Sequence, residues 1–274
     1  TPQAELPILE VEHLRVQFTS DSGTTTAVVD ESFSIRPGET LALVGESGSG
    51  KSVTSLSVMR LVEHGGGKIV NGSIKLRCRD GRVVDLRHAN KSELQHLRGS
   101  EVAMIFQEPM TSLNPVFTVG AQIAESLILH RGMDEKEALK EAVHLLELVR
   151  IPDAERISLR FPHQLSGGMR QRVMIAMALA CDPDILIADE PTTALDVTIQ
   201  AQIIELMQEM QEKNGNAIIM ITHDLGVVAN IADRVAVMYA GDIVEIGTAD
   251  EIYYDPRHPY TWALLSSMPQ MGIK

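Results

Sequence analysis

The most informative run of residues in the chain is Gly45-Glu46-Ser47-Gly48-Ser49-Gly50-Lys51-Ser52. It matches G-x-x-x-x-G-K-[ST], a pattern whose glycines let backbone N–H groups turn inward around a polyphosphate. The run before it, Leu41 to Val44, is wholly apolar and typical of a strand buried on both faces. A helix is expected to begin within the stretch, and its N-terminus adds partial positive charge. The sequence therefore predicts a strand, a phosphate loop and a helix that together bind a nucleotide.

Two side chains at the end of this stretch have separate tasks. Lys51 can reach the outer phosphates, and the Ser52 hydroxyl can ligate Mg²⁺. A chance turn rich in Gly and Ser is the alternative, but it explains neither the strand before the loop nor the helix after it.

A second apolar run ends in two carboxylates. Ile185 to Ala188 is followed by Asp189 and Glu190. In a protein with a phosphate loop, the first acid after such a strand holds Mg²⁺, directly or through water. The second can orient and deprotonate an attacking water, which makes Glu190 the candidate general base. An Asp-Glu pair alone is more often a solvated turn or a helix cap, but the phosphate loop in the same chain favours the catalytic interpretation.

A third stretch, Leu165-Ser166-Gly167-Gly168-Met169-Arg170-Gln171, stands just before an expected helix. Two glycines beside a serine at a helix start are a second place where phosphate oxygens meet backbone N–H groups. One chain seldom needs two such loops for one nucleotide. A symmetric dimer would let each loop complete the site of the other subunit.

These stretches together resemble the ABC-ATPase family. The run Leu165 to Gln171 resembles the family's signature, and four further motifs stand in the family's order: Phe18 where an aromatic packs against adenine, Gln107 of the Q-loop after the apolar run Val102 to Phe106, Ala194-Leu195-Asp196 of the D-loop, and His223 as the switch histidine. A lone Phe, Gln or His would carry no such meaning. The resemblance extends from Phe18 to about Ile246, nearly the whole chain.

The resemblance implies a set of roles for ATP and Mg²⁺. The ATP-binding set is Phe18, Gly45, Glu46, Ser47, Gly48, Ser49, Gly50, Lys51, Ser52, Val53, Gln107, Ser166, Gly167, Gly168 and Asp196. Ser52, Gln107 and Asp189 would arrange Mg²⁺. Glu190 would polarise the water, while Lys51 and His223 would contact the terminal phosphates. Ser166 and Gly168 of the opposing subunit would stabilise the developing charge, so that two ATP molecules lie between two such domains.

The alternation of strands and helices predicts an α/β fold: a P-loop NTPase core of the ABC-ATPase type, with an antiparallel β subdomain and an inserted helical subdomain. A single domain is expected over 1–274, with its catalytic core at about 1–107 and 172–250. The helical subdomain covers about 108–171, and a C-terminal extension begins over about 251–274.

Individual elements follow from apolar periodicity. The expected set is a bulged strand over Ile8 to Phe18, a turn over Asp21 to Thr26, a helix after Ser52 that carries Leu56, Met59 and Leu61 and ends at Gly65 to Gly67, strands around Ile74 and over Ala217 to Ile221, helices over Val173 to Cys181 and about Ile199 to Met210, and a hairpin over Val235 to Ile246. Between Val119 and Val149 apolar residues recur every three or four positions, which predicts a pair of amphipathic helices.

The composition limits which kinds of partner and site are expected. The chain has 24 Lys and Arg against 37 Asp and Glu, a net charge of −13, which argues against a nucleic-acid partner. Cys78 and Cys181 cannot make a tetrahedral zinc site alone and are expected to be apolar fillers in a reducing cytosol. The longest apolar run has nine residues, Val173 to Cys181, whereas a membrane span takes about 20. The start, Thr1 to Glu12, does not resemble a signal peptide and lacks an initiator Met, so a trimmed chain or part of a longer one is expected.

Two stretches indicate which kind of ABC protein this is. Gln107 to Pro115 resembles the segment after the Q-loop in oligopeptide and dipeptide import ATPases, and Asp255 to Thr261 resembles the start of their C-terminal extension. That extension usually continues for several dozen residues, whereas this chain stops at Lys274. Some members, glutathione importers among them, carry two such ATPases in one polypeptide, so an isolated half of a tandem chain is a further expectation.

The resemblance implies an importer ATPase for dipeptides, oligopeptides or glutathione. Its expected partners are a second ABC ATPase domain (an identical copy, a paralogue or a tandem half), two integral membrane permease subunits and, indirectly, an extracytoplasmic solute-binding protein. Its expected place is cytoplasmic, on the inner face of the cell membrane. The alternative is a soluble ABC ATPase acting on ribosomes or DNA, although such proteins typically have two nucleotide domains, zinc cysteines or long coiled coils. A P-loop kinase outside the ABC group does not explain Leu165 to Gln171. The solute and the pairing of ATPase domains stay open.

Overall fold

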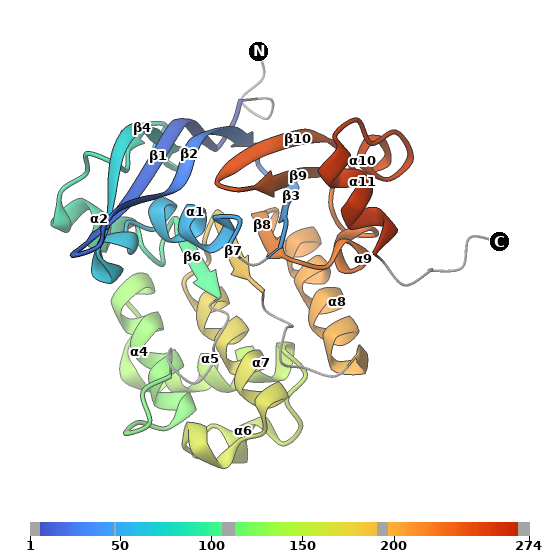
Figure 1. Ribbon diagram of the computed structural model, residues 1–274. Helices are drawn as coiled ribbons and strands as arrows, with labels where there is room; N and C mark the ends of the chain where they lie inside the picture. Colours follow the sequence, from blue (N-terminus) through green and yellow to red (C-terminus); the bar gives the residue numbers. More distant parts are fainter. Residues whose placement is uncertain (1–5, 47, 106–112, 191–196, 268–274) are drawn as a thin grey trace. The chain divides into compact units, whose positions relative to one another are not determined.

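The structure, a computed structural model, describes residues 6–46, 48–105, 113–190 and 197–267 (Figure 1). The chain divides into two compact units. The first joins Thr1–His96 to Ala217–Lys274, and the second is the continuous segment Leu97–Asn216. The subdomain boundaries expected from the sequence stay a prediction.

The first unit contains an antiparallel sheet. Its strands are β1 (Leu9–Ser20), β2 (Gly23–Ile35), β4 (Gly67–Arg77) and β5 (Val83–Asp85), in the order β2-β1-β4-β5. The expected bulge in β1 is confirmed: the pairing with β2 shifts register between Val11 and Leu14, where His13 has a φ of +52°. The expected turn over Asp21 to Thr26 is wrong beyond Ser22. Thr24 to Thr26 extend β2 because they pair with β1, a position that β-branched side chains favour.

A second group of strands in this unit holds the phosphate loop. The strands β3 (Thr40–Val44), β8 (Ala217–Thr222), β9 (Arg234–Tyr239) and β10 (Asp242–Thr248) lie in the order β10-β9-β3-β8. Both β8 and β9 run parallel to β3, and every residue of β3 and β8 is buried. Burial on both faces explains why these strands are continuous apolar runs. The expected β9–β10 hairpin, turning at Ala240 and Gly241, is confirmed.

The helix after the phosphate loop, α1 (Lys51–Val58), is shorter than expected. Apolar spacing continues to Leu61, but Arg60 has a φ of +55°, which ends the helix. The Arg60 guanidinium donates to the carbonyls of Leu86, Arg87 and Ala89 at 2.8, 2.7 and 3.2 Å. A short 3-10 helix, Val62–Gly65, follows, and Gly67 already belongs to β4. Tertiary hydrogen bonds donated by the Arg60 side chain therefore outweigh the helical spacing of the apolar residues.

Several short helices were not expected. They are α9 (Leu225–Val228), α10 (Ala249–Tyr254) and α11 (Pro259–Ser266) in the first unit, and α2 (Lys91–Leu97) at the end of its N-terminal part. The helix α10 packs against the β9–β10 hairpin (Figure 1). Residues 249–266, called the C-terminal segment below, thus contain two helices, and α10 contacts the strands beside the phosphate loop.

The second unit has two strands and a group of helices. The strands β6 (Val102–Ile105) and β7 (Ile185–Asp189) pair in parallel. The helices α4 (Val119–Arg131), α5 (Glu135–Leu148) and α7 (Gly167–Ala180) pack against one another, with α6 (Ala154–Ile157) beside α5. The last helix, α8 (Val197–Asn214), is longer than the expected Ile199 to Met210.

The amphipathic pair predicted between Val119 and Val149 is confirmed as α4 and α5. Thr118 caps α4, accepting the N–H of Ala121 at 3.2 Å, and Asp134 caps α5, accepting the N–H of Glu137 at 2.8 Å. The apolar positions that define the pattern are all buried: Ile123, Leu127, Ala138, Ala142, Leu145, Leu146 and Val149. Across the described ranges, no helix is long and apolar enough to cross a membrane.

Candidate nucleotide-binding site

The phosphate loop lies between β3 and α1, as predicted, and its glycines are required by its backbone. Gly48 and Gly50 have φ values of +83° and +98°, in the region that favours glycine. A Cβ on Gly50 would stand 2.7 Å from the carbonyl oxygen of Ala27, and one on Gly45 would stand 2.5 Å from that of Met238. Neither position has room for a side chain.

The β9–β10 hairpin supports the loop from outside. The N–H of Gly241 donates to the carbonyl of Ser49 at 2.9 Å, and the carbonyl of Gly241 accepts the N–H of Val29 at 2.9 Å. Within the loop, the N–H of Ser49 donates to the carbonyl of Glu46 at 3.2 Å. The tip of the hairpin therefore links the loop to the antiparallel sheet.

Lys51 is the first residue of α1 and only 4% exposed. Its ammonium group donates to the carbonyl of Gly45, at the opposite end of the loop. No side chain caps the N-terminus of α1 at Gly50. A loop of this shape presents backbone N–H groups and one buried cation, an arrangement suited to a polyphosphate.

His223 lies at the same edge of the sheet as the phosphate loop. The parallel strands β3 and β8 end together, with Val44 opposite Thr222, so the loop and His223 both follow the carboxyl ends of neighbouring strands. His223 is exposed. The next residue, Asp224, caps α9 by accepting the N–H of Gly226 at 2.8 Å. In open α/β sheets ligands bind at this edge.

Phe18 lies near the end of β1, half-buried, opposite Thr25 of β2 and Gly67 of β4. Its ring covers Gly67 so closely that a Cβ there would stand 2.9 Å from Phe18 Cζ. The assignment of Phe18 to adenine stays a prediction.

Sequence reasoning missed one buried group behind the loop, Glu31 of β2. Its side chain is 0% exposed, and burial raises the pKa of its carboxyl to about 8. The Thr54 hydroxyl of α1 lies 2.8 Å from Glu31 Oε2 and 2.9 Å from the carbonyl of Gly50. The hydrogen bond donated by Thr54 favours the ionised carboxylate, but the cost of burial outweighs it and keeps the pKa of Glu31 raised. A signal existed in the sequence: Glu31 continues the alternation of Phe33 and Ile35 on the buried face of β2.

The two carboxylates belong to the second unit. Asp189 is the last residue of β7 and 5% exposed, and Glu190 follows with a φ of +45°. That conformation is unfavourable for a glutamate by about 1–3 kcal/mol, and such strain is concentrated at functional sites. The backbone strain at Glu190 is consistent with the role predicted for it.

The stretch that resembles the signature lies at the start of α7. The expectation that it stands just before a helix is wrong in one respect: Gly167 and Gly168 form the first turn, because Ser166 is the N-cap and accepts the N–H of Met169 at 3.2 Å. Ser166 and Gly167 are exposed. The N-terminus of this 14-residue helix is therefore open to solvent within the second unit.

Three predicted residues, Ser47, Gln107 and Asp196, lie outside the described residues. The others divide between the two units. Phe18, the phosphate loop and His223 belong to the first, and Ser166 to Gly168 with Asp189 and Glu190 belong to the second. Within the described ranges, no group of three or more His, Cys, Asp and Glu side chains could hold a metal by itself. Mg²⁺ commonly takes one or two protein oxygens plus substrate phosphates, and the Ser52 hydroxyl and Asp189 carboxylate are ligands of that kind.

Together, the fold, the phosphate loop and the helix that Ser166 caps define an ATPase of the ATP-binding cassette type. The chain belongs to the ABC transporter family: the family model for ABC transporters matches residues 28–193. A second family model, for the C-terminal region of oligopeptide/dipeptide transporters, matches residues 244–274.

Curated relatives are similar over almost the whole chain. The glutathione import ATP-binding protein GsiA of Escherichia coli strain K12 is 58% identical over 265 residues, which are 97% of this chain and 42% of that protein. GsiA of Pectobacterium atrosepticum is 58% identical over 268 residues, which are 98% of this chain and 43% of that protein. The chain thus spans less than half the length of these relatives.

Solved structures show the same fold. The dimeric ATP-binding cassette MJ0796 in a post-hydrolysis state, bound to ADP and Pi, has a TM-score of 0.77 and 27% identity, covering 88% of this chain and 98% of that one. The protein cbiO1 from Clostridium perfringens, part of the ABC transporter complex cbiONQ, has a TM-score of 0.73 and 28% identity, covering 92% of each chain.

Proposed function

We propose that this chain is the ATP-hydrolysing part of an ABC importer that takes up peptides or related small solutes, namely dipeptides, oligopeptides or glutathione. The observation that carries the proposal is the phosphate loop: Gly45 and Gly50 leave no room for side chains, and the loop leads into a buried lysine at a helix start. The import class is supported by the match of residues 244–274 and by the relatives named for glutathione import.

The residues predicted for phosphate, metal and catalysis have separate chemical tasks in this proposal. The loop from Gly45 to Val53 binds the phosphates of ATP, with Lys51 on the outer ones and His223 at the same edge. Glu190 holds and deprotonates the attacking water. Ser52, Asp189 and Gln107 would hold Mg²⁺ together with the phosphates, and the bound ion would offset the phosphate charge.

The exposed start of α7 supports an assembly of two ATPase domains. Ser166 to Gly168 present a second helix N-terminus, whereas a nucleotide on the chain's own phosphate loop already has that of α1. The start of α7 is therefore assigned to the nucleotide of a second domain. That domain is a second copy, a paralogue or the other half of a tandem chain. Two membrane permease subunits and, through them, a solute-binding protein complete the assembly, on the inner face of the membrane.

Replacing one carboxylate tests the catalytic part. Glu190→Gln should retain MgATP binding, lose nearly all hydrolysis, and accumulate as an ATP-bound pair of domains that elutes earlier in size-exclusion chromatography. Glu147→Gln, which alters an exposed carboxylate of α5, is the matched control and should hydrolyse ATP normally. Normal turnover by Glu190→Gln would refute Glu190 as the base.

Affinity capture tests the importer. Tagged Glu190→Gln protein loaded with MgATP should retain polytopic membrane proteins, with a solute-binding protein alongside, from gently solubilised source membranes. Retention of ribosomes or DNA-repair proteins without any membrane subunit would replace the importer by the soluble alternative and leave only the ATPase.

A further inference from the structure

A residue of the C-terminal segment contacts the phosphate loop directly. The N–H of Glu46 donates to the hydroxyl oxygen of Tyr260 at 3.0 Å, although 214 positions separate the two residues. Tyr260 is near the start of α11, in the region that matches the oligopeptide/dipeptide C-terminal family. Partial burial raises the pKa of Tyr260, so its hydroxyl stays protonated at neutral pH.

The contact fixes one particular peptide group. The N–H of Glu46 and the carbonyl of Gly45 belong to the same peptide plane, and that carbonyl accepts the ammonium group of Lys51. One edge of the plane is therefore held by Tyr260 and the other by Lys51. If the Tyr260 hydroxyl is removed, the plane keeps only its contact with Lys51, so the carbonyl that holds the lysine is less firmly oriented.

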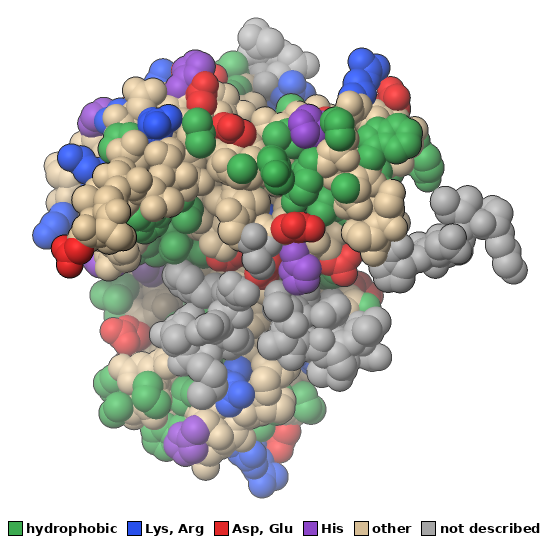
Figure 2. Space-filling view, viewed as in Figure 1, with side chains coloured by type: hydrophobic (Ala, Val, Ile, Leu, Met, Phe, Trp, Pro, Cys, Tyr) green, Lys and Arg blue, Asp and Glu red, His purple; other side chains and the backbone are tan. Residues whose placement is uncertain are grey.

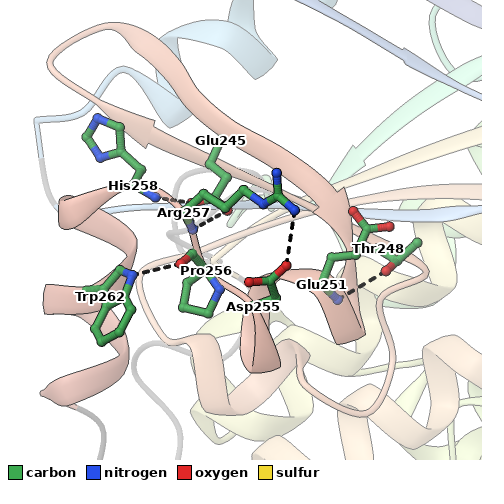
Figure 3. Close-up of polar contacts among 8 residues, drawn as sticks. All are labelled: Glu245, Thr248, Glu251, Asp255, Pro256, Arg257, His258 and Trp262. Atoms are coloured by element: carbon green, nitrogen blue, oxygen red, sulfur yellow. Dashed lines mark hydrogen bonds and ion pairs between the residues drawn. The ribbon is translucent and has the colours of Figure 1, made fainter.

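The segment that carries Tyr260 is anchored on β10 (Figure 3). The Glu245 carboxylate accepts the N–H of Arg257 at 2.9 Å and that of His258 at 2.8 Å. Partial burial opposes ionisation of Glu245, but these donors outweigh it and lower the pKa of the carboxyl. His258 in turn caps α11, its Nδ1 accepting the N–H of Tyr260 at 3.0 Å. These bonds fix the backbone of Tyr260.

The ring of Tyr260 is positioned as well. It lies against the ring of Tyr239, with 4.7 Å between centroids and 45° between planes. Tyr239 ends β9 next to the hairpin tip whose Gly241 supports Ser49. The side-chain hydroxyl of Tyr260 thus reaches the loop from a fixed backbone and a fixed ring.

We propose that Tyr260 is a positioning residue of the phosphate loop: it orients the Gly45–Glu46 peptide, presets Lys51 for the nucleotide, and so couples the C-terminal segment to nucleotide binding. This inference rests on the proposed ATPase function. Tyr260 touches no reacting group, because it acts on the loop backbone alone.

The chain contains its own reporter. Its single tryptophan, Trp262, is 60% exposed on α11, with its indole N–H donating to the carbonyl of Pro256 at 2.7 Å (Figure 3). In the space-filling view, hydrophobic side chains gather over the region of the β9–β10 hairpin, α10 and α11 (Figure 2). Any displacement of this segment on nucleotide binding changes the surroundings of one fluorophore two residues from Tyr260.

The experiment compares Tyr260→Phe with Tyr254→Phe, a matched control because Tyr254 is 82% exposed on α10. MgATP binding is measured by calorimetry, and Trp262 emission is followed in the same titration. Loss of one hydrogen bond should raise the Kd of Tyr260→Phe about 3- to 10-fold. Its emission change at saturating MgATP should fall to less than half that of the wild type, while Tyr254→Phe matches the wild type in both readouts. Glu245→Gln keeps Tyr260 but weakens the hydrogen bonds that hold Arg257 and His258, so it should also raise the Kd.

The outcomes separate this inference from the proposed function. A wild-type chain that does not bind MgATP would refute the proposed function. A wild-type chain that binds, with Tyr260→Phe equal to it in Kd and in emission change, would overturn the role of Tyr260 alone. An equal loss of affinity in Tyr254→Phe and Tyr260→Phe would also overturn it. The effect would then not depend on the hydrogen bond between the Tyr260 hydroxyl and the Glu46 N–H.

Discussion

Replacing Glu31 by glutamine should remove a pH dependence from the stability of the protein. The two side chains have the same shape, but glutamine does not titrate. The carboxyl is fully buried, and its pKa is raised from the usual 4.5 to about 8. Between these values the native state holds a proton that the unfolded chain has released. The free energy of unfolding therefore falls as pH rises through this window.

The size of the effect follows from the shift. One pKa unit corresponds to about 1.4 kcal/mol, so the contribution of Glu31 is fully present below about pH 4.5 and is lost as pH rises to about 8. Between about pH 5.5 and about pH 7.5 the wild type should lose about 2–3 kcal/mol from this group, which the variant does not lose. Glu31→Gln should thus gain about 2–3 kcal/mol relative to the wild type over that interval.

Urea unfolding of both proteins at the two pH values measures this difference. Histidines and other groups titrate equally in both proteins, so the change in the difference between them isolates Glu31. The exposed-carboxyl variant Glu147→Gln serves as the control and should follow the wild type at both pH values. A stability difference between Glu31→Gln and the wild type that stays the same within about 0.5 kcal/mol would refute the reasoning, because Glu31 would then be ionised in both states.

Three further outcomes are expected. Gly50→Ala should abolish MgATP binding and cost about 1–3 kcal/mol of stability, because the φ of Gly50 is +98° and the new Cβ would stand 2.7 Å from the Ala27 carbonyl oxygen. Calorimetry and thermal unfolding measure the two effects, and a variant with wild-type affinity would contradict the prediction. Ser166→Ala should cost about 1 kcal/mol through loss of the α7 cap, measured by urea unfolding, and an unchanged midpoint would exclude the cap. Burial raises the pKa of the Cys181 thiol to about 11 although Arg131 opposes the shift, so iodoacetamide at about pH 8 should label folded protein on the order of 100-fold more slowly than unfolded protein, and equal rates would count against the shift.

The elements that could be predicted are those whose stabilisation is local or periodic. The buried strands β3, β7 and β8 are continuous apolar runs, and α4 and α5 repeat apolar residues every three or four positions. The phosphate loop was identifiable because its glycines are a steric requirement that few other residues meet.

What sequence reasoning missed depends on distant contacts. The end of α1 is stabilised by hydrogen bonds from the Arg60 side chain to the carbonyls of residues 86, 87 and 89. The apolar pattern of the sequence contains no information about these contacts. The helix α11 is not predictable from apolar spacing, because it is short and its start is defined by Pro259 and the cap at His258. The contact between Tyr260 and Glu46 joins residues at opposite ends of the chain. Glu31 was detectable in principle as one carboxylate in an alternating buried face.

The order of the strands around β3 has a consequence for synthesis of the chain. Residues 40–44 leave the ribosome early, yet both neighbours of β3, which are β8 and β9, follow only after the whole second unit at Leu97–Asn216. Until β8 and β9 have been synthesised, both edges of the apolar strand β3 stay unpaired, a condition that favours aggregation and delays folding. The phosphate loop can therefore reach its folded form only after β8 and β9 have been synthesised, and premature termination before Ala217 leaves β3 without either neighbour.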